Sequence, residues 1–184
     1  MVNQNLQNII TGCQQNNPAD QEQLYKLFYN YGLTICSRYA YTQEEAREML
    51  NDAFVKIFRG INKYEFKGSF KSWIYPVFVR CCVDYYRKFY ERKAPPPVGL
   101  ESAETASVSP DIFSNMDYQG LLQLIRNLPP VYSVVFNLAV VEGYKHSEIA
   151  KMLNISEGTS KSNLSRAKQK MKAMILAQNL VTDE

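Results

Sequence analysis

Cationic and hydroxyl side chains gather between residues 151 and 172, and groups of these two kinds can bind other molecules by charge and by hydrogen bonds. The stretch holds six lysines and arginines against one acid, Glu157. Cations neutralise nucleic-acid phosphates, while hydroxyl, amide and guanidinium groups hydrogen-bond to base edges. The pattern therefore predicts DNA binding. The alternative is an ordinary helical hairpin with a solvated basic face.

Two short helices joined by a tight turn would present these side chains. Ser147 and Ser156 are the predicted N-caps, and Asn154 stands at the turn, where a residue tolerant of positive φ is needed. Ile155 is expected to fill the gap between the helices. The inner faces are marked by Ile149, Ala150, Leu153, Leu164, Ala167 and Met171, with Ser160 roughly on the same stripe. This spacing predicts a helix-turn-helix.

The composition argues against an enzyme or a metal protein. Hydrophobic residues make up 46% of the 184 residues, so a packed core is expected. The four cysteines form no CxxC pair, and His146 is the only histidine, so we predict no metal site, no disulfide framework and no cofactor. A dyad of Cys81 or Cys82 with His146 is disfavoured because these residues fall in different predicted lobes. We predict no catalytic residues and no small-molecule substrate.

The order of elements predicts an all-α protein with two small helical domains joined by a flexible linker. Apolar residues recur at helical spacing along most of the chain, and a helix of about 44–60 would end at Gly60. Two further apolar stripes are Leu24, Leu27, Phe28 and Tyr31, and Leu121, Leu124, Ile125 and Leu128. Residues 93–111 read KAPPPVGLESAETASVSPD, which is typical of an extended linker. Asp117 is a plausible N-cap where the helical pattern resumes. We therefore predict an N-terminal domain at 1–93, an acidic linker at 94–113, and a helix-turn-helix domain at 114–184.

Two stretches together resemble a known family. Residues 128–171, LPPVYSVVFNLAVVEGYKHSEIAKMLNISEGTSKSNLSRAKQKM, resemble the C-terminal DNA-binding domain of extracytoplasmic-function (ECF) sigma factors of the sigma-70 family. Residues 44–88, EEAREMLNDAFVKIFRGINKYEFKGSFKSWIYPVFVRCCVDYYRK, resemble the N-terminal domain of the same family. The resemblance implies a dissociable subunit that directs bacterial RNA polymerase core to promoters and catalyses nothing itself.

The resemblance also implies three sets of contacts. One helix of the N-terminal domain would dock on core polymerase, and its motif positions are Glu48, Asn51, Asp52, Phe54, Lys56 and Arg59. The block that melts the minus-ten element would use Lys63, Phe66, Lys67, Phe70, Lys71, Trp73, Arg80, Arg87 and Lys88. The minus-thirty-five element would be read by Glu157, Gly158, Thr159, Lys161, Ser162, Ser165 and Arg166.

Melting has its own chemical requirements, which the second set can meet. Cations must hold the phosphates, and aromatic surfaces must hold an unstacked base. The lysines and arginines would supply the first, and Tyr64, Phe66, Phe70 and Trp73 the second. The competing interpretation makes Phe70, Trp73 and Phe78 ordinary core residues, and it is favoured for Phe78. Pro76 is expected to bend the helix that carries them.

The resemblance further implies a partner and a location. Promoter DNA and core polymerase are the expected partners, and members of the family commonly bind an anti-sigma factor, often one anchored in a membrane. The N-terminus has no signal-peptide pattern and no apolar run reaches about 18 residues, so a cytoplasmic protein is expected. Two other classes stay open: a free-standing DNA-binding regulator that uses only the helix-turn-helix, and a helical interaction module without a nucleic-acid role.

Overall fold

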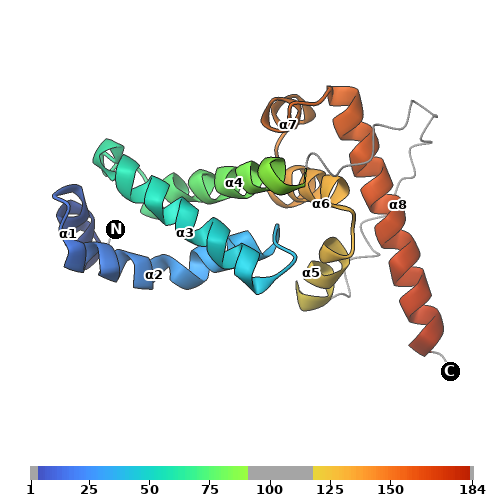
Figure 1. Ribbon diagram of the computed structural model, residues 1–184, viewed down its shortest axis with the longest axis horizontal. Coiled ribbons are helices and arrows are strands. Elements are labelled where there is room, and N and C mark those ends of the chain that lie inside the picture. Colours follow the sequence, from blue (N-terminus) through green and yellow to red (C-terminus); the bar gives the residue numbers. More distant parts are fainter. Residues whose placement is uncertain (1–3, 91–117, 183–184) are drawn as a thin grey trace. The chain divides into compact units, whose positions relative to one another are not determined.

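The computed structural model describes residues 4–90 and 118–182, which form helices and connecting turns without a strand in either range (Figure 1). The all-α prediction is therefore confirmed. The chain divides into two compact units, Met1–Asp84 and Tyr85–Glu184. The predicted linker at 94–113 and the N-cap expected at Asp117 lie outside the described residues, so the domain bounds given above stay predictions.

Four helices build the first unit, and their starts follow from the sequence. They are α1 (Gln4–Gln14), α2 (Pro18–Ser37), α3 (Gln43–Gly60) and α4 (Phe70–Phe89), the last running into the second unit, with a 3₁₀ turn η1 (Ile61–Lys63) after α3. The side chain of Asn17 accepts a hydrogen bond from the N–H of Ala19 at the start of α2. At the start of α3, Thr42 and Glu45 form a capping box. The helix predicted at 44–60 is confirmed.

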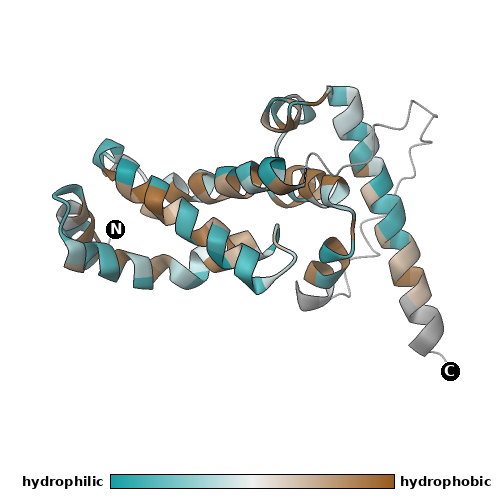
Figure 2. Cartoon of the chain, in the orientation of Figure 1, coloured by the Kyte–Doolittle hydropathy of each residue, from teal (hydrophilic) through white to brown (hydrophobic). Residues whose placement is uncertain are grey.

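Phe78 of α4 lies at the centre of the first unit's core. Its side chain is fully buried, and its ring meets those of Tyr31 and Phe54 edge-on, with centroids 6.4 and 5.6 Å apart. Gly32 of α2 lies against the same ring, where a larger residue would not fit. Hydrophobic colouring covers much of α4 in Figure 2, as expected for a helix with this role. The core interpretation of Phe78 is confirmed.

The predicted apolar stripe of α2 contains one error. Leu24 and Phe28 are buried, but Leu27 remains 56% exposed. The buried positions on this helix are 24, 28, 32, 35 and 36, and Leu27 lies on the solvent side of that face. Pro76 does lie inside α4, as the sequence indicated.

The second unit holds the shorter helices and the longest one. They are α5 (Tyr118–Arg126), α6 (Pro130–Phe136), α7 (His146–Leu153) and α8 (Glu157–Thr182). Pro130 is the first residue of α6, where a missing backbone N–H costs nothing. The helix then widens into a π-helical segment η4 (Asn137–Val141), closed by the N–H of Glu142 on the carbonyl of Asn137 at 2.9 Å. The sequence pattern had not indicated this widening.

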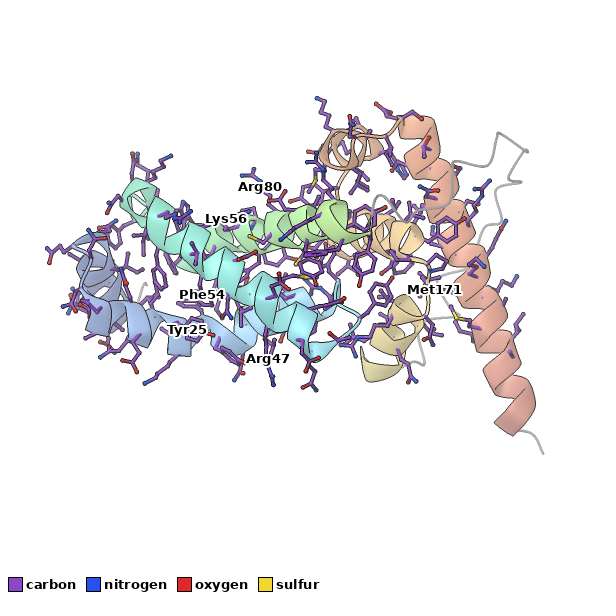
Figure 3. The ribbon with its side chains drawn as sticks, in the orientation of Figure 1. Tyr25, Arg47, Phe54, Lys56, Arg80 and Met171 are labelled. Atoms are coloured by element: carbon purple, nitrogen blue, oxygen red, sulfur yellow. The ribbon has the colours of Figure 1, made fainter. Side chains whose placement is uncertain are left out.

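A continuous apolar cluster joins α5, α6 and α8. Met171 belongs to it and is fully buried (Figure 3). The cluster consists of Leu124, Ile125, Leu128, Phe136, Ala167, Met171 and Ile175, with Leu121, Tyr132, Leu164 and Met174 packed against it. The stripe predicted for residues 121–128 therefore faces the core, and so does the inner stripe of the second helix of the helix-turn-helix.

The cysteines are buried among apolar side chains. All four are free thiols. Burial raises the pKa of Cys13 and of Cys81 to about 11, and it raises the pKa of Cys82 as well. Across residues 4–90 and 118–182, no group of three or more histidine, cysteine or acidic side chains is placed to hold a metal ion. No helix in the same ranges combines the length and apolarity needed to cross a membrane.

Candidate nucleic-acid interface

The tight turn between α7 and α8 has the geometry of a helix-turn-helix. Asn154 adopts the left-handed conformation, with φ 53° and ψ 45°. The N–H of Ile155 donates to the carbonyl of Ala150 at 3.0 Å, which closes the end of α7. The prediction that Asn154 takes positive φ is confirmed.

The start of α7 differs from the prediction. The helix begins at His146, and the N–H of Lys145 donates to a carboxylate oxygen of Glu148 at 2.8 Å. Ser147 therefore lies inside the first turn and is not the N-cap. The cap comes from Glu148, because a carboxylate in the first turn satisfies the free N–H and favours the positive end of the helix dipole.

The start of α8 is fixed by hydroxyl groups. The Oγ of Ser156 accepts from the N–H of Thr159 at 2.9 Å and lies 2.8 Å from Thr159 Oγ1, so the predicted cap is confirmed. Ser162 Oγ donates to the carbonyl of Thr159 at 3.0 Å. Two of the predicted contact residues, Thr159 and Ser162, are thus held by bonds within the helix's first turns.

His146 of α7 pairs with Ser160, a buried polar residue of α8, where the two helices cross. Ser160 is fully buried on the inner stripe, and its Oγ lies 2.8 Å from Nδ1 of His146. A hydrogen bond therefore joins α7 to α8 where an apolar residue would have packed. Burial, and next the positive charge of Lys161, hold the pKa of His146 below its ordinary value of 6.5.

The outer face of α8 carries the residues predicted for the minus-thirty-five element. Glu157, Gly158 and Lys161 are exposed, whereas Thr159, Ser162, Ser165 and Arg166 are partly buried at the edges of the inner stripe. All seven lie within the first three turns of the helix. This end of α8 therefore presents a cation, hydroxyls and a guanidinium, the groups that bind phosphates and base edges in the major groove.

In the first unit, Tyr64 organises the loop between η1 and α4. Its hydroxyl donates to the carbonyl of Gly68 at 3.0 Å, and its ring is buried. Phe66 and Gly68 both have positive φ, at 58° and 78°. A phenylalanine in this region is strained, and such residues are held only where surrounding contacts compel them. The loop is therefore tightly built around Tyr64.

Four aromatic rings meet in and beside this loop. The ring of Tyr64 lies 5.2 Å from Phe66, 5.1 Å from Phe70 and 5.5 Å from Trp73. Phe70 and Trp73 stack, with centroids 5.6 Å apart. Phe66 and Trp73 are partly exposed, but Phe70 is 98% buried, since its exposed fraction is 2%. Phe70 is therefore a core residue under the aromatic cluster, and the prediction that its ring stacks on a base is wrong.

Cations surround the loop and continue along α4. Lys67 pairs with Glu65 at 2.6 Å, but both side chains are exposed, so the pair contributes little to stability. The ammonium of Lys71 lies 5.3 Å from the ring centre of Tyr31. The remaining predicted cations, Lys63, Arg80, Arg87 and Lys88, are all exposed.

The residues predicted to dock on core polymerase all lie on α3, but they differ in how far they are exposed to solvent. Phe54 is buried, and its ring packs against Tyr25 of α2 with centroids 4.6 Å apart (Figure 3), so it is a core residue and not the expected surface anchor. Glu48, Asp52 and Arg59 are exposed. This helix therefore offers a polar and charged surface over an aromatic core.

Two of these α3 side chains are held by neighbours that the sequence did not indicate. Asn51 Oδ1 accepts from the hydroxyl of Tyr25 at 3.0 Å. Lys56 Nζ donates to Asp84 of α4 at 2.7 Å, and this bond raises the pKa of Lys56. The partners lie 26 and 28 positions away in the sequence, so no local pattern could have found them.

Comparison with known proteins identifies the family. The model for sigma-70 region 2 matches residues 24–92, which include the aromatic loop, and the model for sigma-70 region 4 matches residues 118–171, which include the helix-turn-helix. The chain belongs to the sigma-70 family, in the extracytoplasmic-function group of its curated relatives. The resemblance seen in the sequence is thus confirmed.

Two relatives and one solved structure illustrate the likeness. The ECF RNA polymerase sigma factor SigM of Mycobacterium tuberculosis is 27% identical over 139 residues, which cover 73% of this chain and 66% of SigM. SigE of Mycolicibacterium smegmatis is 24% identical, over 82% of this chain and 56% of SigE. The chain thus spans less than two thirds of the length of these relatives. The sigma factor RpoE of Bartonella quintana, solved with the anti-sigma factor NepR, shares the fold with a TM-score of 0.50 and 18% identity, over 86% of this chain and 97% of RpoE.

Proposed function

We propose that this chain is an ECF-type sigma factor that binds bacterial RNA polymerase core, recognises minus-ten and minus-thirty-five promoter elements, and starts transcription of a specific regulon. The observation that carries the proposal is that the chain holds two different kinds of candidate DNA-binding site, in the order in which the sigma-70 family has them. A strained aromatic loop ringed by cations comes first, and a helix-turn-helix with a polar outer face follows.

The helix-turn-helix supports duplex recognition at the minus-thirty-five element. Hydrogen bonds close its turn and its helix caps, so the first turns of α8 are already ordered and could enter a DNA groove without a change of conformation. Lys161 and Arg166 would contact phosphates or base edges, and Ser162 and Ser165 are short enough to let the helix approach the bases. The amide groups of Glu157 and Gly158 would face a phosphate, whereas the N–H of Thr159 already donates to the Oγ of Ser156.

The aromatic loop supports capture of an unpaired base at the minus-ten element. Phe66 is partly exposed and held beside Tyr64, so a base leaving the duplex would find a ring to stack on. Trp73 offers a second partly exposed ring. Lys63, Lys67 and Lys71, with Arg80, Arg87 and Lys88 along α4, would hold the phosphates of the opened strand.

Proteins are the remaining partners that we propose. The exposed polar residues Glu48, Asn51, Asp52, Lys56 and Arg59 of α3 would bind core polymerase. RpoE was solved with an anti-sigma factor, and we extend a partner of that class to this chain. The protein would work in the cytoplasm, catalyse no reaction itself, and use no cofactor or small-molecule substrate.

Transcription from a randomised promoter library tests the function directly. Bacterial core polymerase is supplied with the purified chain, and the RNA products are sequenced to find which templates were used. We expect initiation well above core alone, with two short upstream elements enriched. Lys161→Ala should change only the distal element and Phe66→Ala only the proximal one. Initiation no better than with core alone would refute the proposal.

A further inference from the structure

One side chain of α1 reaches the loop that carries Phe66. Gln14 is the last residue of α1, and its Nε2 donates to the carbonyl of Ile61 at 3.1 Å and to the carbonyl of Tyr64 at 3.0 Å. The two carbonyls belong to η1 and to the first residue after it. Both hydrogens of one amide group are therefore used to fix the point where the chain leaves the 3₁₀ turn.

The helix that carries Gln14 is itself firmly held. Ile9, Ile10 and Cys13 are buried in the first unit, and α1 contacts both α2 and η1 (Figure 1). Gly12 lets Asp20 of α2 approach so closely that a Cβ there would collide with the carboxylate. Gln14 is thus anchored on a rigid element, as a side chain that positions a loop must be.

Tyr64 connects the hydrogen bonds of Gln14 to the aromatic cluster. Its carbonyl is bound by Gln14, its hydroxyl is bound to Gly68 at the other end of the loop, and its ring contacts Phe66. A shift of the Tyr64 backbone would move all three contacts together. The positive φ of Phe66 makes the loop dependent on such outside support, because the conformation is unfavourable by itself.

We propose that Gln14 is a positioning residue that holds the Tyr64–Ser69 loop in its base-capturing conformation. The proposal deepens the proposed function and rests on it for the role of the loop. The two hydrogen bonds from Gln14, which we call the Gln14 clamp, are a property of the free chain. The region 2 match begins at residue 24, so the clamp comes from a helix outside the matched segment. Residues before the matched segment would then help to set how readily promoter DNA is opened.

Gln14→Glu tests the clamp with little change of shape. An ionised carboxylate keeps the size of the amide but donates no hydrogen bond, so it would repel both carbonyls. Gln14→Asn keeps the amide but is one methylene too short to reach. Gln14→Lys restores donors at similar reach and should rescue the wild-type behaviour. Gln15→Glu is the matched control, because it adds the same charge at the exposed neighbouring position.

Trp73 reports on the loop without DNA or polymerase. It is the only tryptophan of the chain, and it packs against Tyr64 and Phe70. We expect Gln14→Glu and Gln14→Asn to increase acrylamide quenching of Trp73. They should also speed amide hydrogen exchange of Tyr64, whose N–H donates to the carbonyl of Ile61, by about tenfold, which corresponds to the loss of one to two net hydrogen bonds. Exchange in α3 should stay unchanged, as should both signals in Gln15→Glu. Unchanged Trp73 quenching and Tyr64 exchange in both Gln14 variants would overturn the proposal.

A second arm measures the consequence for promoter opening. With core polymerase and a promoter taken from the library, Gln14→Glu should slow formation of the open complex by about tenfold, at unchanged affinity for core. A wild-type chain without affinity for core would refute the proposed function, while the Trp73 measurement would still decide whether the clamp exists. A slowed open complex with an unaltered loop would assign the effect to something other than the clamp and overturn the proposal.

Discussion

At the scale of single residues, the burial of His146 between α7 and α8 sets how the helix-turn-helix responds to pH. The charged groups that act on His146 are Lys161, Glu157 and Lys168, all on α8, and burial has the largest effect. Because the pKa of His146 in the folded chain lies below 6.5, the unfolded chain binds more protons between the two pKa values. The contribution to stability is therefore complete above the unfolded pKa of 6.5, and it is lost as the pH falls from there through the lower pKa of the folded chain.

This sign gives a prediction for thermal unfolding. Between about pH 7.5 and pH 5.5, where carboxylates stay ionised, the melting temperature of the chain should fall, and His146→Asn should flatten the decline. Calorimetry or circular dichroism of both proteins across this range provides the measurement. A melting temperature that rises on acidification in the wild type, or an equal decline in the variant, would speak against the assignment.

Arg166 carries a prediction about DNA reading. If its guanidinium contacts a base, Arg166→Ala should weaken promoter use by about 1–3 kcal/mol in the holoenzyme. Initiation rates on a library-selected promoter measure the loss. Gln123→Ala, on the exposed face of α5, serves as the control and should have no effect. Unchanged transcription in Arg166→Ala would remove this residue from the interface.

The cysteines give a third prediction at this scale. A thiol reacts as its thiolate, and burial raises the pKa of Cys13 and Cys81 to about 11. In the folded chain at about pH 8, the four thiols should react with a disulfide reagent only as fast as the protein unfolds. Four rapid equivalents in denaturant, with none beforehand, is the expected titration. One fast equivalent in the native protein would show an accessible thiol.

At the scale of helices, the packing of α2 on its neighbours depends on a missing side chain. A Cβ at Gly32 would lie 2.5 Å from the ring of Phe78 and 2.6 Å from the side chain of Leu50, so the core would have to shift. Gly32→Ala should lower the free energy of unfolding by about 1–3 kcal/mol in urea titrations. Gly60→Ala is the matched control, because the nearest atom to its Cβ, on Trp73, is 4.0 Å away. Equal effects of the two substitutions would contradict this view of the core.

Local patterns predicted the helices well and their partners poorly. Helical spacing and capping residues gave the range of α3, the left-handed turn at Asn154 and the cap at Ser156, because each depends on neighbours within four positions. Phe54 was expected at the surface, but its burial depends on Tyr25 and on α4. The π-helical widening at 137–141 was also missed, since no local composition distinguishes it from an α-helix.

The same limit applies to the candidate site. The sequence placed cations and aromatics in the right segments, because charge and ring content can be read directly. It did not indicate the Gln14 clamp, whose donor and acceptors lie 47 and 50 positions apart. Nor did it show that Phe70 is buried while Phe66, at positive φ, stays partly exposed.

At the scale of the whole molecule, we propose that the two units have separate tasks and that both depend on core polymerase. The polar surface of α3 would bind polymerase, the loop at 64–69 would take an unpaired base, and the first turns of α8 would read duplex DNA. A net charge of +3 is modest, so strong duplex binding by the chain alone is not expected. Core polymerase should therefore be needed to bring both DNA-binding surfaces into use.

The most direct test compares the affinity of the purified full chain for two partners: bacterial core RNA polymerase, and generic duplex DNA with and without that core. We predict tight binding to core, and duplex affinity that becomes appreciable only when core is present. Strong duplex binding without affinity for core would contradict the account and make the chain a free-standing DNA-binding regulator.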